Sequence, residues 1–442
     1  MKKIFTLLII SLLALPLSAQ NIIKRPKQST NKTTTTKKSS TTTSAKKQTP
    51  TKPSPTATFK STSSSSSSAK KSAPTGTEFS FNGLEFYVVA PNKVSVGRDK
   101  KNPEGNLVIP SQISYNGANY SLTKIRWQAF EGCTGLTSVT IPNSVTDIED
   151  WSFHDCTGLI SISIPNSVTK IGERAFDGCK GLTSINVNPG NNYYTSIDGV
   201  LFTKDKKTLV ALPGGYKGSY SIPNSVTYIG GSAFRRCTGL TSVNIPNSVT
   251  EIGNHAFYGC TGLTSVTIPN SVTKIEWEAF EGCTVLTSIS IPNSVTYIGE
   301  WAFVDCTGLT SITIPNSVTE IGEAAFKGCS GLTSINVNPG NNYYTSIDGV
   351  LFSKDKNFFI AFPGGFKGSY VIPNSVTEIG DEAFAGCTSL TSVTLPNSVN
   401  YIGTYAFSDC KSLRSVSIPS RFKGQKDDII GYCPNLKSIN WY

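Results

Sequence analysis

Eleven cysteines recur along the chain and are the first residues whose chemistry must be decided. Eight of the ten intervals between them are 23 residues long and two are 58 residues long. An odd number of cysteines in an exported protein first indicates disulfides. One cysteine per repeat at a constant phase, however, gives parallel Cβ vectors, whereas a disulfide needs vectors that converge. We therefore expect buried free thiols that behave as small apolar side chains. They are Cys133, Cys156, Cys179, Cys237, Cys260, Cys283, Cys306, Cys329, Cys387, Cys410 and Cys433.

Histidines and carboxylates offer no catalytic pattern. The only two histidines, His154 and His255, lie in different repeats, and we expect both to be solvent-facing loop residues. No Ser-His-acid, Cys-His or metal-ligand spacing can be assembled around them. One repeat phase carries acids such as Glu251 and Glu320, but Lys274 and Tyr297 share that phase, and mixed charges are typical of a solvated surface. We expect no enzyme activity, no metal site and no cofactor.

Large aromatic side chains mark the positions that differ between otherwise constant repeats. Most of them stand just before an Ala-Phe pair, and a tyrosine set occupies a second phase. Exposed Trp and Tyr on rigid elements are typical contact residues for proteins and also stack on sugars. The alternative is that these rings pack on neighbouring repeats and stiffen them. The candidate ligand contacts are Trp127, Trp151, Tyr228, His255, Trp277, Tyr297, Trp301, Tyr401 and Tyr405.

The repeat that must position these residues is clearest at 248–270, SVTEIGNHAFYGCTGLTSVTIPN. A fixed period of this length is the signature of a solenoid, in which each unit buries its apolar side only against its neighbours. Strand alternation predicts that Val266 and Ile268 point inward and that Ser265 and Thr267 point outward. The phenylalanine of each Ala-Phe pair should stack with its equivalents in a buried spine.

The Ile-Gly-x-x-Ala-Phe-x-x-Cys-x-x-Leu-x-x-Ile-x-Ile-Pro pattern resembles the BspA-like class of leucine-rich repeats, over about residues 79–442. The resemblance implies an α/β-type repeat solenoid, a curved leucine-rich-repeat arc with a parallel β-sheet on its concave face. It also implies adhesion to host extracellular proteins or to other cells. The asparagine that commonly forms a ladder after the strand in leucine-rich repeats has no strict counterpart, since Pro-Asn-Ser stands there. How those turns satisfy their backbone groups is therefore open.

Two inserted units and an N-terminal segment interrupt the regular period. Residues 186–200 recur letter for letter at 336–350, and a hairpin is expected after each, which gives inserted units near 186–221 and 336–371 within a solenoid spanning 123–442. The spacing of 150 residues indicates an internal duplication. Residues 77–122 contain Asn-Gly turn signals and are predicted to form a small β cap over the first repeat.

The first 76 residues differ from the rest in composition. Residues 1–19 combine Lys2 and Lys3 with an apolar run and Ala19, which predicts a signal peptide. Residues 20–76 are rich in Ser, Thr, Lys and Pro, which predicts a disordered linker. It is expected to act as a spacer, or as an electrostatic anchor on an anionic surface. The 40 basic residues include 14 before residue 78, and all 29 acids follow, so residues 78–442 carry 26 basic and 29 acidic residues. That balance excludes a strongly basic nucleic-acid-binding surface.

These features together predict a secreted or surface-exposed bacterial protein that mediates adhesion by binding protein partners, including host extracellular-matrix proteins. The alternatives are a glycan-binding surface protein that uses the Trp and Tyr positions, and a structural stalk without a specific ligand. No transmembrane segment and no nucleic-acid partner are expected.

Overall fold

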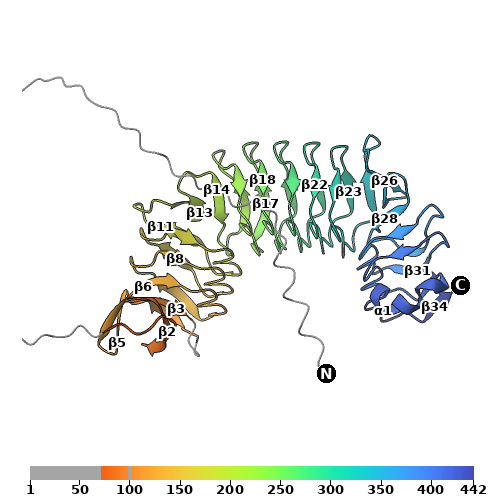
Figure 1. The fold of residues 1–442 in the computed structure, drawn as a ribbon. Coiled ribbons are helices and arrows are strands. Elements are labelled where there is room, and N and C mark those ends of the chain that lie inside the picture. Colours follow the sequence, from red (N-terminus) through yellow and green to blue (C-terminus); the bar gives the residue numbers. More distant parts are fainter. Residues whose placement is uncertain (1–70, 98–101) are drawn as a thin grey trace, which may run out of the picture. The chain divides into compact units, whose positions relative to one another are not determined.

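The computed structural model describes residues 71–97 and 102–442. The predicted signal peptide and nearly all of the predicted linker lie outside these residues. Successive 23-residue repeats form coils that stack side by side in sequence order (Figure 1), which confirms a β-solenoid of repeats. Each coil contributes a longer strand, a two-residue strand and a turn that contains the Ala-Phe pair; we call the last of these the Ala-Phe turn.

The longer strands form the first side of the coils and pair in parallel from coil to coil. Val266 and Ile268 are buried and Ser265 and Thr267 are exposed, as the alternation predicts. The strands are β4 (Gly105–Val108), β7 (Leu136–Thr140), β9 (Ser161–Ile164), β11 (Ser184–Val187), β15 (Gly218–Ser221), β17 (Leu240–Asn244), β19 (Ser265–Thr267), β21 (Ser288–Ser290), β23 (Ser311–Ile314), β25 (Ser334–Val337), β29 (Gly368–Val371), β31 (Leu390–Thr394), β33 (Ser415–Ile418) and β34 (Ser438–Trp441).

Two-residue strands form the second side, also in parallel register. Their second residue is an isoleucine that points into the core. They are β8 (Asp147–Ile148), β10 (Lys170–Ile171), β16 (Tyr228–Ile229), β18 (Glu251–Ile252), β20 (Lys274–Ile275), β22 (Tyr297–Ile298), β24 (Glu320–Ile321), β30 (Glu378–Ile379) and β32 (Tyr401–Ile402).

Hydroxyl groups satisfy the turns between these two sides. Ser294 Oγ donates to the carbonyl of Val272 in the preceding coil at 2.6 Å, and Ser317 Oγ donates to Val295 at 2.6 Å. The Thr296 hydroxyl donates in the same way to Thr273 at 3.3 Å. Serine and threonine of the Pro-Asn-Ser-Val-Thr stretch thus satisfy main-chain carbonyls of the preceding coil in several turns, but the Ser144 and Ser248 hydroxyls have no such partner among the described residues.

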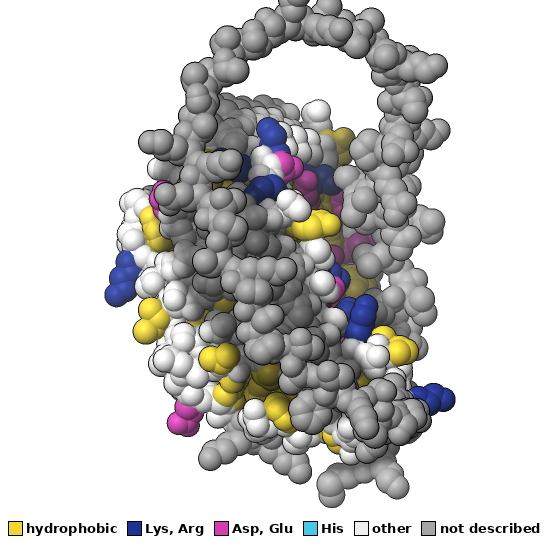
Figure 2. Space-filling view, turned by 90° about the vertical axis from the view of Figure 1, so that its left-hand side faces the viewer, with side chains coloured by type: hydrophobic (Ala, Val, Ile, Leu, Met, Phe, Trp, Pro, Cys, Tyr) yellow, Lys and Arg dark blue, Asp and Glu magenta, His cyan; other side chains and the backbone are white. Residues whose placement is uncertain are grey.

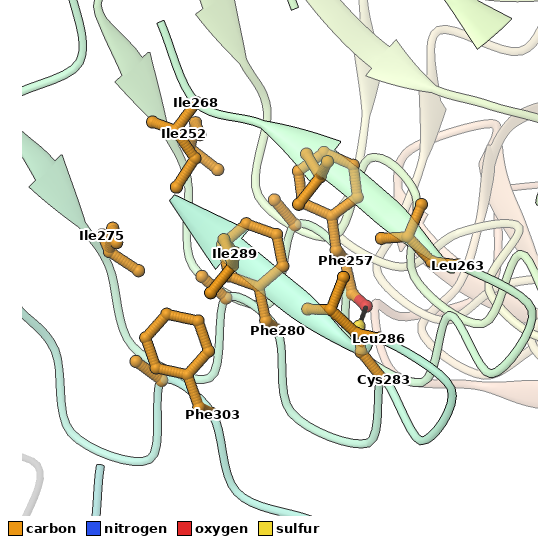
Figure 3. Close-up of a cluster of buried hydrophobic side chains, with 14 of the residues drawn as sticks. Ile252, Phe257, Leu263, Ile268, Ile275, Phe280, Cys283, Leu286, Ile289 and Phe303 are labelled. Atoms are coloured by element: carbon orange, nitrogen blue, oxygen red, sulfur yellow. Dashed lines mark hydrogen bonds between the residues drawn. The ribbon is translucent and has the colours of Figure 1, made fainter. Parts of the chain in front are cut away.

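Phenylalanines of successive Ala-Phe turns stack inside the coils, as Phe257, Phe280 and Phe303 do in Figure 3. Ring centroids are 5.2 Å apart between Phe257 and Phe280 and 5.6 Å between Phe280 and Phe303, with the planes nearly parallel. The expected continuous spine is wrong in one respect. It breaks into three segments, because among the described residues Phe176 has no ring contact with Phe234, and Phe326 has none with Phe384.

Ten of the eleven cysteines are buried, as predicted, and Cys433 is half-buried; no disulfide joins them within the described residues. At least nine of the sulfurs also donate a hydrogen bond to a main-chain carbonyl. Cys283 Sγ donates to the carbonyl oxygen of Phe257 at 3.3 Å (Figure 3), and Cys306 Sγ donates to Phe280 at 3.1 Å. Burial raises the pKa of Cys283 to about 12, which keeps the thiol protonated as a donor.

The N-terminal strands precede the first regular coil. They are β1 (Glu78–Phe81), β2 (Leu84–Ala90), β3 (Lys93–Gly97), β5 (Gln112–Tyr115) and β6 (Ala118–Ile125). Strands β1, β2 and β3 pair antiparallel, and so do β5 and β6, whereas β3 joins β6 in parallel. Strand β6 then pairs with β8, which continues into the two-residue strands. The role of this segment as a cap stays a prediction.

Each 58-residue interval contains three antiparallel strands. In the first interval they are β12 (Tyr194–Ile197), β13 (Val200–Thr203) and β14 (Thr208–Ala211), and in the second they are β26 (Tyr344–Ile347), β27 (Val350–Ser353) and β28 (Phe358–Ala361). Strand β14 pairs in parallel with β16, and β28 with β30, so the last insertion strand takes the place of a two-residue strand.

Helix is scarce in the described residues. It comprises one 3-10 helix, η1 (Ser420–Gln425), and one α-helix, α1 (Lys426–Ile429), both near the C-terminus. The structure therefore does not support the expected α/β-type label. The Ala-Phe segment forms tight turns rather than helices, because two of its residues adopt positive φ in each regular coil.

Candidate functional site

The aromatic candidates before the Ala-Phe pairs fall into two adjacent positions rather than one. Trp151, His255, Trp301 and Tyr405 directly precede the Ala-Phe pair or its Ser-Phe variant and have φ between 51° and 59°. Trp127 and Trp277 stand one residue earlier. All six lie on Ala-Phe turns, which form the third side of the coils.

The left-handed position before the Ala-Phe pair is never glycine. The ten residues that occupy it with positive φ are Gln128, Trp151, Arg174, Ser232, His255, Glu278, Trp301, Ala324, Glu382 and Tyr405. A second left-handed position, directly before cysteine, is occupied in six of ten coils by glycine: Gly132, Asp155, Gly178, Arg236, Gly259, Gly282, Asp305, Gly328, Gly386 and Asp409. Left-handed φ favours glycine and is unusual for bulky side chains. The position before the Ala-Phe pair therefore holds residues with side chains, although its left-handed backbone costs them conformational free energy.

Main-chain hydrogen bonds hold the Ala-Phe turns rigidly in line. The Trp301 N–H donates to the Glu323 carbonyl at 3.1 Å, and the Phe303 N–H donates to the Ala325 carbonyl at 2.9 Å. The same two bonds recur between most neighbouring coils. Side chains on consecutive turns are therefore separated by the distance between neighbouring coils.

Trp277 and Trp301 form the aromatic pair of this surface. Their ring centroids are 6.2 Å apart, and each side chain is 39% exposed. Trp127, near the N-terminal end of the solenoid, and Tyr405, near the C-terminal end, are exposed and lie outside this pair. Trp151 is half-buried and packs edge-on against His154 at 4.6 Å.

The tyrosines of the second phase lie on a different side, at the first residue of two-residue strands. Tyr228 pairs with Glu251, Tyr297 pairs with both Lys274 and Glu320, and Tyr401 pairs with Glu378. Charged residues therefore separate the tyrosines, so the structure does not gather them with the tryptophans. Tyr401 is exposed, whereas Tyr228 and Tyr297 are half-buried.

The expectation that both histidines face solvent is wrong. His154 and His255 are each 6% exposed, because the turns on either side bring charged partners over the rings. His255 Nε2 lies 2.9 Å from Arg174 Nη2 and 3.0 Å from Glu278 Oε2. Burial, together with the charges of Arg174 and Arg235, lowers the pKa of His255 to about 4, so the ring is neutral at pH 7.

These histidines belong to a charged network where the first insertion interrupts the Ala-Phe turns. We call this place the first junction: the turn of Arg174 faces the turn of Ser232, 58 residues later. Asp177 is buried and accepts a hydrogen bond from Arg235 Nε at 2.8 Å, and His154 Nε2 lies 3.5 Å from the same carboxylate. Burial raises the pKa of Asp177, but its contacts with His154 and Arg235 outweigh burial and hold it below its usual value. The sequence analysis missed this network, although the 58-residue interval marked its position.

The second junction is the equivalent place 150 residues later, where the turn of Ala324 faces the turn of Glu382. A pocket of about 220 Å³ opens there, against about 150 Å³ at the first junction. Among the residues 71–97 and 102–442, no group of three or more His, Cys, Asp or Glu side chains could hold a metal ion.

The outward face of the longer strands is a wide groove of small polar side chains. Thr267, Ser290 and Thr313 are exposed there, with a volume of about 680 Å³ around the Pro-Asn turns. Figure 2 shows part of the described surface, on which basic and acidic side chains are interspersed. No helix in the described part of the chain is long and apolar enough to cross a membrane.

Stacked coils of parallel strands with a conserved apolar ladder define a leucine-rich-repeat solenoid, and comparison with known proteins agrees. The family model described as "BspA type Leucine rich repeat region (6 copies)" matches residues 111–214, 218–333, 251–368 and 361–442. The chain belongs to this BspA-type leucine-rich repeat family. It is a family of protein-binding repeat proteins that are typically not enzymes.

Two solved structures illustrate the likeness. A leucine rich cell surface protein from Faecalibacterium prausnitzii A2-165 is 27% identical, with 84% of this chain and 95% of that chain covered and a TM-score of 0.44. A leucine-rich repeat protein from Bacteroides ovatus ATCC 8483 is 26% identical, with 82% and 99% covered and a TM-score of 0.40. No curated protein sequence matches the chain.

Proposed function

We propose that this chain is a secreted or cell-surface protein that binds a protein partner through its Ala-Phe turns, centred on Trp277 and Trp301. Binding of this kind would mediate adhesion to host extracellular proteins or to other cells. The family assignment, the similarity to a protein named as a cell surface protein and the predicted signal peptide support this proposal.

The observation that carries the proposal is the left-handed position before the Ala-Phe pair. Glycine would adopt its φ without strain, yet it never stands there: Trp, Tyr, His, Arg, Glu and Gln occupy eight of the ten turns, and Ser and Ala the other two, whereas glycine fills the second left-handed position in six of ten coils. Strained backbone retained under a large side chain is a reason to look for a function of that side chain. Trp301 combines this backbone with partial exposure and an aromatic neighbour.

Rigid presentation favours a protein ligand. The ladder of main-chain bonds fixes the backbone of Trp277 and Trp301, and the Trp277 ring packs against His255 and Trp301, so little side-chain entropy is lost on binding. Tryptophan is also among the residues that most often dominate binding energy at protein interfaces. A glycan that stacks on the same rings is the second candidate, since both tryptophans are partly exposed.

The test compares the wild type with Trp277→Ala/Trp301→Ala on arrays of extracellular-matrix proteins, bacterial surface proteins and glycans. Tyr193→Ala is the matched control, because Tyr193 is 53% exposed but lies on the first insertion. Loss of these hot-spot residues should weaken binding of the protein partner by more than about tenfold. The control should bind as the wild type does.

Three results would contradict the proposal. Absence of any bound protein would exclude an adhesive function, and unchanged affinity of the double variant would exclude the Trp pair as its site. Signal restricted to the glycan array, and lost in the double variant, would replace a protein ligand by a sugar.

A further inference from the structure

We propose that the second junction is a receptor pocket for an arginine side chain of the partner protein, with Trp301, Glu382 and Tyr405 arranged around the guanidinium. This inference rests on the proposed function, because it names the chemistry of the protein that is bound. At the first junction an arginine of the chain itself, Arg174, stands at the equivalent place and lines a smaller pocket of about 150 Å³.

The first junction shows how a guanidinium fits between the two turns. Arg174 reaches across the insertion, with Nε 3.4 Å from Ser232 Oγ and Nη2 2.9 Å from His255 Nε2. Its guanidinium carbon lies 5.0 Å from the centre of the Trp151 ring, a cation–π contact. Trp151, Ser232 and His255 thus form the cradle of a bound arginine.

The second junction has the same backbone but lacks that arginine. The Trp301 N–H donates to the Glu323 carbonyl at 3.1 Å, as the Trp151 N–H does to Glu173 at 3.0 Å. The residue that corresponds to Arg174 is Ala324, with φ of 51° against 56°. The cradle residues Trp151, Ser232 and His255 correspond, 150 positions later, to Trp301, Glu382 and Tyr405, of which Glu382 lines the pocket and the other two stand on the flanking turns.

Each replacement in the cradle suits an arginine that comes from outside. Trp301 is 39% exposed and Tyr405 is 49% exposed, whereas Trp151 is half-buried and His255 is buried. Glu382 provides a carboxylate where the first junction has only the Ser232 hydroxyl. A guanidinium can pair with a carboxylate and stack on aromatic rings at the same time, which an ammonium does less well.

The charge of the pocket also favours a cation. Glu323, Asp381, Glu382 and Lys327 are the charged residues that line it, three acids against one base. Lys327 Nζ pairs with Glu382 Oε2 at 2.8 Å, so one base is shared among the three acids. Burial and the nearby carboxylates of Asp381 and Glu382 raise the pKa of Glu323. A bound guanidinium would relieve this crowding of like charge.

The floor and the backbone of the pocket provide room for the rest of an arginine. Phe326, Phe358 and Phe362 line the floor and can contact its aliphatic stem. The main-chain N–H groups of Ala324 and Phe326 have no acceptor among residues 71–97 and 102–442, because the insertion displaces the next coil. A peptide carbonyl beside the arginine could accept one of these bonds.

The experiment measures binding of short capped peptides, acetyl-Gly-Arg-Gly-amide and its citrulline and lysine analogues, to the folded protein by calorimetry. The arginine peptide should bind at least about tenfold more tightly than the citrulline peptide, which keeps the shape but lacks the charge. Equal binding of the two would overturn the proposal. A lysine peptide that bound as well as arginine would overturn the assignment to a guanidinium.

Ala324→Arg is the decisive variant, since its side chain should narrow the pocket from within and occupy the guanidinium position, as Arg174 does at the first junction. We expect it to fold, because arginine occupies this backbone position at 174, and to lose peptide binding by about tenfold or more. Glu382→Gln should also weaken the arginine peptide. Full binding by a folded Ala324→Arg protein would contradict the site.

Trp277→Ala separates this inference from the proposed function. Trp277 belongs to the proposed partner surface, but its equivalent at the first junction takes no part in the cradle. The Trp277→Ala variant should lose partner binding but still bind the arginine peptide. If the wild-type protein binds its partner but not the arginine peptide, the pocket alone is refuted. If it binds the arginine peptide but no partner protein, the Trp277–Trp301 surface alone is refuted.

Discussion

The two junctions share one backbone plan and differ in how side chains close it. At both, the last insertion strand pairs with a two-residue strand and a main-chain bond of 2.8 Å follows, from Leu212 to Ala233 and from Phe362 to Ala383. At the first junction Arg174 contacts Ser232 and His255, and Asp177 pairs with Arg235, so charged side chains bridge the two turns. The second has one ion pair and a larger pocket. An internal duplication can thus keep a fold constant while its side chains diverge toward different tasks.

The floor of the second junction is more aromatic, and this predicts the largest difference in stability. Phe384 contacts Phe359, Phe362 and Phe407 with centroids 4.6 to 4.9 Å apart, whereas Phe234 packs on Phe257 at 4.7 Å and reaches Tyr220 only at 6.1 Å. Both rings are fully buried. Phe384→Ala should cost about 4–5 kcal/mol and Phe234→Ala about 3 kcal/mol. Local hydrogen exchange around each junction measures both, and equal losses would refute the difference in packing.

The buried ion pair of the first junction predicts the next effect. Arg235→Ala leaves the Asp177 carboxylate buried without its strongest partner, which should cost about 3 kcal/mol. The matched change at the second junction is Lys327→Ala. Lys327 is 30% exposed, so the loss should be about 1 kcal/mol. Urea unfolding of both variants checks this order, and a larger loss for Lys327→Ala would reverse our interpretation.

Arg174→Ala should make the first junction more like the second. The loss of its contacts with His255 and Trp151 should cost about 1 kcal/mol. The charge of Arg174 also helps to lower the pKa of His255 to about 4. The variant should therefore raise that pKa, which an NMR titration of the His255 ring would follow. An unchanged His255 titration would show that the two groups do not interact.

The smallest predicted effect is a pH dependence between the junctions. Burial, followed by the carboxylates of Glu278 and Asp305, raises the pKa of Glu281 to about 7. Because this folded-state pKa lies above the unfolded value of 4.5, the contribution of Glu281 is full below about pH 4.5 and is lost as pH rises through 7. The pKa of His255 is lowered in the folded protein, so its contribution to stability is full above the usual value of 6.5 and is lost as pH falls through about 4.

Glu281→Gln isolates this contribution. The difference in unfolding free energy between the variant and the wild type should change between pH 5 and pH 8, with the wild type gaining relative stability at the lower pH. A difference that is constant across this range would mean that Glu281 ionises with an ordinary pKa. The control is Glu104→Gln, which changes a carboxylate whose surroundings lie outside both junctions. Phe130→Tyr would not serve as a control, because that ring is buried.

Local patterns in the sequence were sufficient for the coil itself. The period of 23 residues, the alternation at Val266 and Ile268 and the constant phase of the cysteines each determine a contact with the next coil, so they could be read without coordinates. The hydrogen bonds that eight of the thiols donate to phenylalanine carbonyls could not, since they depend on the path of the preceding turn.

The sequence by itself therefore determined the family, the repeat and the inward side chains, because a solenoid repeats one local solution against its neighbours. The tertiary structure decided what happens where the period fails. Arg174 and His255 are 81 residues apart, and Ala324 lies 58 residues before Glu382. Only the path of the chain around each insertion brings such residues together, leaving one junction bridged by charged side chains and the other with a larger pocket.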